Sequence, residues 1–79
     1  MMWYVYILKC ADGDNYTGCT QNLDERIERH QKGYVEATKE RLPVVLKVFT
    51  AFDDKYKAYE YEKYLKSGSG RAFVKKHLL

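Results

Sequence analysis

Residues 3–19 read WYVYILKCADGDNYTGC, and the start of the fold can be predicted from them. The apolar, aromatic and β-branched side chains of residues 3–9 are typical of a strand. The segment Ala11-Asp12-Gly13-Asp14-Asn15 supplies turn chemistry, and a second short strand is predicted over about residues 15–19. This arrangement predicts a β-hairpin.

Helix and strand signals alternate along the next part of the chain. Asn22 and Glu25 have the spacing of a capping box and predict a helix that ends near Gly33. After Pro43, residues 44–52 read VVLKVFTAF, a run of apolar and β-branched side chains. This run predicts another strand.

Two helices are predicted in the last third of the chain. Asp53 or Asp54 is expected to cap the first of them, which ends near Gly68. We interpret Ser67-Gly68-Ser69-Gly70 as a flexible joint and residues 71–78 as a short final helix.

The predicted element order is therefore β-β-α-β-α-α. A single hairpin is not stable by itself, so the three strands are expected to form one sheet on which the helices pack. The predicted fold class is α/β, more narrowly α+β, with a small three-stranded, mainly antiparallel sheet flanked by helices.

The size and composition predict one folded unit over residues 1–79, because a chain of 79 residues can bury only one modest core. Hydrophobic residues make up 46% and charged residues 32%, as in ordinary globular proteins. No segment approaches the roughly 20 apolar residues of a membrane helix. The apolar run near the amino terminus is not preceded by the basic residues that are typical of a signal peptide. We therefore expect a cytoplasmic protein with no membrane partner.

The two cysteines, Cys10 and Cys19, lie where a hairpin would bring them near each other. Two thiols make neither a disulfide framework nor a zinc site. We therefore expect both cysteines to be in the reduced thiol form and to serve as packing or turn residues. The net charge of +3 is a mild basic bias, which permits nucleic-acid binding without requiring it.

Several motifs follow one another in order along the chain: Tyr4-Val5-Tyr6, Tyr16-Thr17-Gly18, the segment Asn22-Leu23-Asp24-Glu25-Arg26, His30, and Ala58 to Lys66 with Glu62. With this order and spacing, the chain resembles the GIY-YIG nuclease domain over nearly its whole length. The resemblance is closest to the small stand-alone subgroup, to which the tail from Lys66 to Phe73 is also similar.

The resemblance implies catalytic roles for four side chains. One phenol, that of Tyr6, takes a proton from the attacking water, directly or through a metal-bound hydroxide, and Tyr16 orients the nucleophile or the phosphate. Arg26 stabilises charge on the phosphate oxygens, and His30 is a second phosphate contact or a proton shuttle. Arg26 and His30 are four residues apart, so both project from one stripe of their helix.

Each of these residues also has a plain structural interpretation. Strand tyrosines commonly pack against a sheet, Arg26 can be a solvated surface charge, and His30 can be a buried, hydrogen-bonded structural residue. Gly18 lets the backbone approach a phosphate or fits a tight passage from strand to helix, and the alternative is an ordinary turn glycine.

Glu62 matches the metal-binding glutamate of the family. The resemblance implies that this carboxylate holds one Mg²⁺ or Mn²⁺ ion, which keeps most of its waters and bridges to the phosphate. The alternative is an ion pair with Lys66, four residues later on the same helix.

Contacts to backbone phosphates are expected from basic side chains spread over the chain: Lys9, Arg26, Arg29, Lys32, Lys39, Arg41, Lys66 and Arg71. Trp3 or Tyr34 is available to stack on an unpaired base. A mixed charged surface without a ligand is the alternative for each lysine.

The chain departs from the family pattern at three positions. Tyr4 stands where the first signature has glycine, Thr17 stands at the centre of the second, and no asparagine follows Asn22. Neither Tyr4 nor Thr17 stands where the reacting group is expected, and the role of the asparagine that some members place after the metal glutamate is absent here or transferred to another residue.

We therefore expect a metal-dependent endonuclease that acts on DNA, including branched, flapped or damaged DNA. The alternatives are a non-catalytic or partner-dependent nucleic-acid-binding module and a small structural protein whose tyrosines only pack. A protein partner or a homodimer is compatible with one active site on so small a chain.

Overall fold

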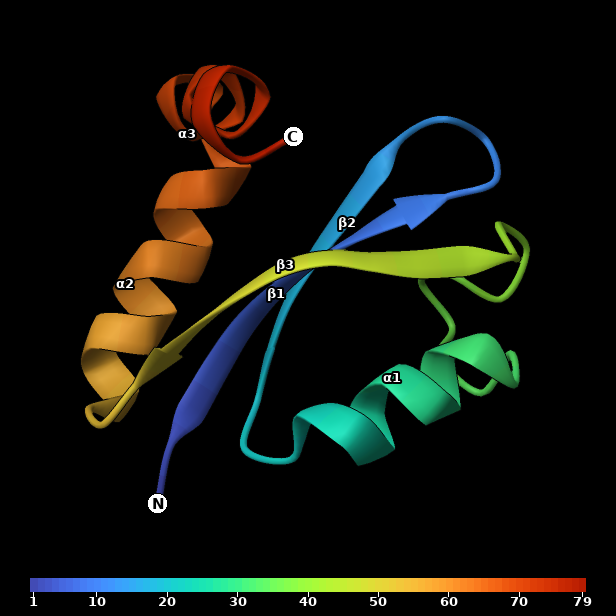
Figure 1. Ribbon diagram of the computed structural model, residues 1–79, viewed down its shortest axis with the longest axis horizontal. Helices are drawn as coiled ribbons and strands as arrows, with labels where there is room; N and C mark the ends of the chain where they lie inside the picture. The colour runs from blue at the N-terminus through green and yellow to red at the C-terminus, as the bar shows by residue number, and fades with distance from the viewer.

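The computed structural model describes residues 1–79. Its elements are β1 (Trp3–Cys10), β2 (Asn15–Thr20), α1 (Leu23–Gln31), β3 (Val44–Phe52), α2 (Lys55–Lys66), α3 (Gly68–Phe73) and the π-helical segment η1 (Val74–Leu78). The strands form one sheet in the order β2-β1-β3, and both neighbouring pairs are antiparallel (Figure 1). The predicted α+β class and element order are confirmed. None of the helices has the length and apolar character needed to cross a membrane.

The central strand β1 is buried on both faces. Successive side chains of a strand point to opposite faces, so β1 contributes to two separate apolar clusters. One cluster lies against α2 and consists of Val5, Ile7, Ala58, Leu65 and Val74. The other lies on the α1 face and consists of Tyr6, Leu8, Cys10 and Val44, with Leu23 and Ile27 of α1 packed on it. The two helices therefore cover opposite faces of the sheet (Figure 1).

Local capping signals set the starts of α1 and α2. The Asn22 side chain accepts a hydrogen bond from the backbone N–H of Glu25 at 3.2 Å, as the capping-box spacing predicts. Asp54, rather than Asp53, caps α2 by accepting from the backbone N–H groups of Tyr56 and Lys57. Each cap contributes about 1 kcal/mol to helix stability.

The prediction of a flexible joint at Ser67-Gly68-Ser69-Gly70 is wrong. The Ser67 hydroxyl donates to the carbonyl of Tyr64 at 2.6 Å and accepts from the N–H of Gly70 at 3.1 Å, so α3 begins directly after α2. A Cβ atom on Gly70 would collide with the Tyr64 carbonyl. This glycine allows close packing of two helices rather than flexibility.

Cys10 and Cys19 are free thiols. Cys10 belongs to the cluster beneath α1, whereas Cys19 packs against the cluster beneath α2. The hairpin therefore directs the two thiols to opposite faces of the sheet and does not bring them together.

Candidate active site

Tyr6 lies at the centre of β1, with a side chain that is 0% exposed. It pairs with Gly18 of β2, and a Cβ atom on Gly18 would collide with the Tyr6 phenol. Gly18 therefore leaves room for the Tyr6 ring. Since Gly18 lies within β2, the interpretation of this residue as an ordinary turn glycine is wrong.

His30 connects Tyr6 to Thr38, a residue that the sequence did not indicate. Nε2 of His30 lies 2.8 Å from Oη of Tyr6. Nδ1 of His30 lies 2.8 Å from Oγ1 of Thr38. His30 and Thr38 are both 0% exposed. The three side chains form a hydrogen-bonded chain from the centre of the sheet, through α1, to the connection between α1 and β3.

Tyr16 and Arg26 complete the cluster around His30. The ring centre of Tyr16 lies 5.2 Å from that of His30 and 6.4 Å from that of Tyr6. Arg26 lies one helical turn before His30, and its Nε atom is buried without a hydrogen-bond partner. A buried N–H group that lacks an acceptor is costly. This guanidinium is therefore suited to receive an anion.

The surroundings of Tyr6 act on its pKa in opposite directions. Burial raises the pKa of the phenol above its ordinary value, and the Arg26 guanidinium lowers it. The negative charge of Glu62 raises the pKa of Tyr6 further. The phenol is therefore neutral at pH 7, and added positive charge near Glu62 favours the phenolate.

Glu62 lies on α2 beside β2. Burial raises the pKa of Cys19 in β2, and the Glu62 carboxylate raises it further. The Glu62 side chain is 22% exposed and accepts a hydrogen bond from Nζ of Lys66 at 2.9 Å. The ion pair that was the alternative interpretation of Glu62 is therefore present.

A carboxylate of this kind fits only one type of metal site. The chain has no group of three or more His, Cys, Asp or Glu residues that could hold an ion together. Mg²⁺ and Mn²⁺ accept one carboxylate when waters and substrate phosphates supply the other ligands. Glu62 fits such a site, which a bound phosphate would complete.

The basic residues expected to contact phosphates differ in their surroundings. Lys9, Lys66 and Arg71 line one cleft, together with Lys75, which the sequence did not indicate. Arg29 is exposed on α1. Arg26 is described above, and the remaining three are paired with acids: Lys32 with Glu28 at 2.8 Å, Lys39 with Glu36 at 3.0 Å, and Arg41 with Asp12 at 2.7 Å.

The two aromatic residues suggested for base stacking differ in their surroundings. The Trp3 ring packs edge-on against Tyr59 at 5.6 Å, and Nζ of Lys55 lies 5.5 Å from the Trp3 ring centre. Trp3 is therefore occupied by contacts within the protein. Tyr34 is 64% exposed and remains available to a ligand.

Replacement of Gly18 by alanine is expected to displace the Tyr6 ring, because the added methyl group needs the space that the phenol occupies. Overpacking of this kind costs about 1–3 kcal/mol, and it would break the contact with His30. Urea unfolding measures the loss of stability. Alanine at exposed Gly68, where an added Cβ meets nothing within 4 Å, is the control. Equal stability of the two variants would contradict the packing of Tyr6 over Gly18.

The stability of the fold is expected to fall as the pH falls below about 6.5. Burial, with a smaller effect of Arg26, lowers the pKa of His30 from 6.5 to about 4. Between these values the unfolded chain binds the proton and the folded chain does not, so acid favours unfolding. The loss is on the order of 2–3 kcal/mol between pH 7 and pH 4.5.

Urea unfolding of the native protein and of His30→Gln at both pH values measures this effect. The variant is expected to lose less stability on acidification, because it lacks the titrating group. His77, which is exposed, is present in both proteins, so its contribution cancels in the comparison. The same pH dependence in both proteins would contradict the buried neutral imidazole.

The chain is similar to several known proteins. A family model described as the GIY-YIG catalytic domain matches residues 2–76. A UPF0213 protein of Clostridium perfringens is 47% identical over 66 residues, which cover 82% of this chain and 71% of that protein. A UPF0213 protein of Pediococcus pentosaceus is 40% identical over 74 residues, which cover 92% of this chain and 78% of that protein. The solution NMR structure of a UPF0213 protein from Bacillus halodurans matches with a TM-score of 0.62 and 37% identity, over 96% of this chain and 84% of that one.

Proposed function

Because this chain belongs to the GIY-YIG family, we propose that it is a metal-dependent endonuclease that hydrolyses a phosphodiester in DNA, including branched, flapped or damaged DNA. The observation that carries the proposal is the buried Nε atom of Arg26, which has no partner and belongs to the cluster around Tyr6. A phosphate oxygen would supply the missing acceptor.

The hydrogen-bonded chain supports Tyr6 as the general base. A neutral imidazole has one N–H group, so the two hydrogen bonds of His30 run in one direction. A phenolate at Tyr6 can only accept, so in that state Nδ1 of His30 accepts from the buried hydroxyl of Thr38. Nε2 then carries the hydrogen and donates to Oη of Tyr6. This direction stabilises the phenolate, which accepts a proton from the attacking water.

The other side chains of the cluster act on the phosphate. Arg26 stabilises the charge that develops on the phosphate oxygens, where a partly buried guanidinium is more effective than one in water. Tyr16 orients the water or the phosphate from the outer strand. Glu62 would hold a divalent cation, Mg²⁺ or Mn²⁺, and its positive charge would polarise the phosphate.

The test is a panel of labelled duplex, branched, flapped, nicked and single-stranded DNAs, incubated with the protein in Mn²⁺, in Mg²⁺ or in EDTA. Cleavage that requires the metal and favours one DNA structure is the expected result. An RNA of the same sequence distinguishes the two nucleic acids. Metal-independent cleavage, or none on any substrate, would overturn the proposal.

The Glu62–Lys66 ion pair favours a second candidate, a nucleic-acid-binding module that is inactive alone or depends on a partner. Lys66 forms an ion pair with the Glu62 carboxylate, which the enzyme needs as a metal ligand. This candidate predicts salt-dependent DNA binding that Glu62→Ala does not change, and no cleavage in any metal.

The proposal extends to a cytoplasmic location and to DNA as the main partner. One cluster per chain cleaves one strand at a time. Cleavage of both strands would therefore require a second copy of the chain, as in a homodimer, or another protein partner.

A further inference from the structure

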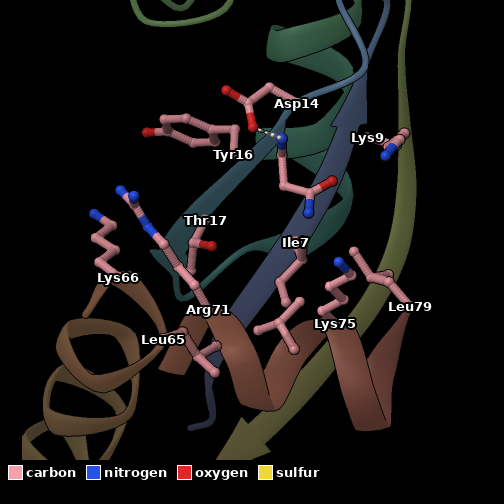
Figure 2. A pocket seen from close by; sticks show the side chains of 12 residues that line it. Ile7, Lys9, Asp14, Tyr16, Thr17, Leu65, Lys66, Arg71, Lys75 and Leu79 are labelled. Atoms are coloured by element: carbon pink, nitrogen blue, oxygen red, sulfur yellow. Dashed lines mark hydrogen bonds between the residues drawn. The ribbon is translucent and has the colours of Figure 1, made fainter. Parts of the chain in front are cut away.

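A basic cleft lies between the β-hairpin and the last helical segments. We define it by its four cationic side chains, Lys9 of β1, Lys66 of α2, Arg71 of α3 and Lys75 of η1. Its volume is about 700 Å³, within the range of ligand-binding pockets. Figure 2 shows Lys66 and Arg71 on the same side of the cleft as Tyr16 and Thr17.

The charges of the basic cleft are poorly balanced within the chain. Lys9, Arg71 and Lys75 form no ion pair, in contrast to Lys32 and Lys39 elsewhere on the surface. Asp14 is the one acidic side chain that lines the cleft. Like charges around one hollow repel one another, so an anionic ligand would be favoured there.

The interior of the cleft is apolar, with Ile7, Leu65 and Val74 among its lining side chains. Such a site has an apolar interior and several separate cations at its edge. It suits a ligand in which phosphate groups recur at intervals and less polar groups lie between them. A nucleic-acid strand has this chemistry, since sugars and bases separate its phosphates. A single small anion would use only one or two of the cations.

The basic cleft adjoins the candidate active site at two points. Tyr16 lines the cleft and also packs against His30, at 5.2 Å between ring centres. Lys66 lines the cleft and is bonded to Glu62. The cleft lies on the α2 face of the sheet and the cluster around Tyr6 on the α1 face, so a strand cleaved beside Tyr16 and Glu62 would reach the cleft around the edge strand β2.

We propose that the basic cleft binds the backbone of the nucleic-acid strand that flanks the cleaved bond, with consecutive phosphates on Arg71, Lys75 and Lys9. The proposal rests on the proposed nuclease function for the position of the cleaved bond. Binding to the cleft itself can be measured without cleavage. The cleft would hold the strand in register, whereas Arg26 contacts the reacting phosphate.

The test compares two triple variants that remove the same charge. One is Lys9→Gln/Arg71→Gln/Lys75→Gln. The control is Lys47→Gln/Lys57→Gln/Lys63→Gln, which changes exposed lysines of β3 and α2 outside the cleft. Fluorescence anisotropy in EDTA measures the affinity of each protein for a labelled oligothymidylate of about 20 nucleotides across a range of salt concentrations.

The cleft variant is expected to bind at least about tenfold more weakly, with the slope of log K against log salt reduced by roughly 0.7 per lost phosphate contact. The control variant is expected to keep the native slope. Equal losses in both variants, an unchanged slope in the cleft variant, or no binding by the native protein would each overturn the proposal.

The two proposals fail in different ways in this experiment. Native binding that the cleft substitutions weaken, without cleavage on any substrate in Mn²⁺ or Mg²⁺, supports the cleft and overturns the nuclease. Metal-dependent cleavage together with binding that the cleft substitutions leave unchanged supports the nuclease and overturns the cleft.

Discussion

Substitution of Tyr6 by phenylalanine is expected to lower metal-dependent cleavage by about 10²–10⁴-fold, the range that a positioned acid or base contributes. The phenyl ring still fills the buried space in the sheet, so the fold is expected to persist. The substitution removes the 2.8 Å hydrogen bond to Nε2 of His30. Loss of one partner of a buried hydrogen bond costs about 1–3 kcal/mol. Single-turnover cleavage rates and thermal unfolding, measured in parallel, separate the two effects.

Two further variants test whether the loss belongs to the hydrogen-bonded chain. Tyr56→Phe removes a hydroxyl from a side chain that is 71% exposed and should cleave at the native rate. Thr38→Val keeps the side-chain shape but removes the partner of Nδ1 of His30, and a smaller loss of rate is expected. Native-rate cleavage by Tyr6→Phe would exclude Tyr6 as the general base.

The strands and the first two helices could be predicted because their signals are local. The cap of α1 needs only Asn22 and Glu25, which are three residues apart. The spacing of Arg26 and His30 predicted a shared stripe of α1. That this stripe faces Tyr6 depends on how α1 packs on the sheet, which no local pattern indicates.

Thr38 and Lys75 could not be predicted for the same physical reason. Thr38 lies in an irregular segment with no periodicity, and only its burial against His30 distinguishes it from a surface threonine. Lys75 joins the basic cleft because η1 and the hairpin, far apart in the sequence, line the same cleft. The prediction of a flexible joint at Gly70 was wrong because glycine occurs both in flexible segments and where two segments pack closely, and the sequence does not distinguish the two cases.

Substitution of Glu62 by glutamine is expected to remove the divalent-cation dependence of cleavage, so that the rate in Mg²⁺ or Mn²⁺ falls to the rate in EDTA. A bound cation contributes several kcal/mol to transition-state stabilisation, so the loss is at least about 10²-fold. The effect on folding should be small, because an ion pair between neighbouring turns of a helix surface, such as Glu62–Lys66, contributes about 0.5 kcal/mol or less. A large kinetic effect with little loss of stability distinguishes a metal ligand from a structural partner of Lys66.

Glu60→Gln is the matched control, since Glu60 is an exposed acid on the same helix and forms no ion pair. Titration of Mn²⁺ against cleavage rate should give the native curve for this control and no saturable response for Glu62→Gln. Loss of the negative charge of Glu62 also lowers the pKa of Tyr6, since the carboxylate raises it. If Glu62 acted only on this pKa, Glu62→Gln would cleave faster than the native protein at neutral pH. A fall in rate therefore identifies the metal role, and a rise would contradict it.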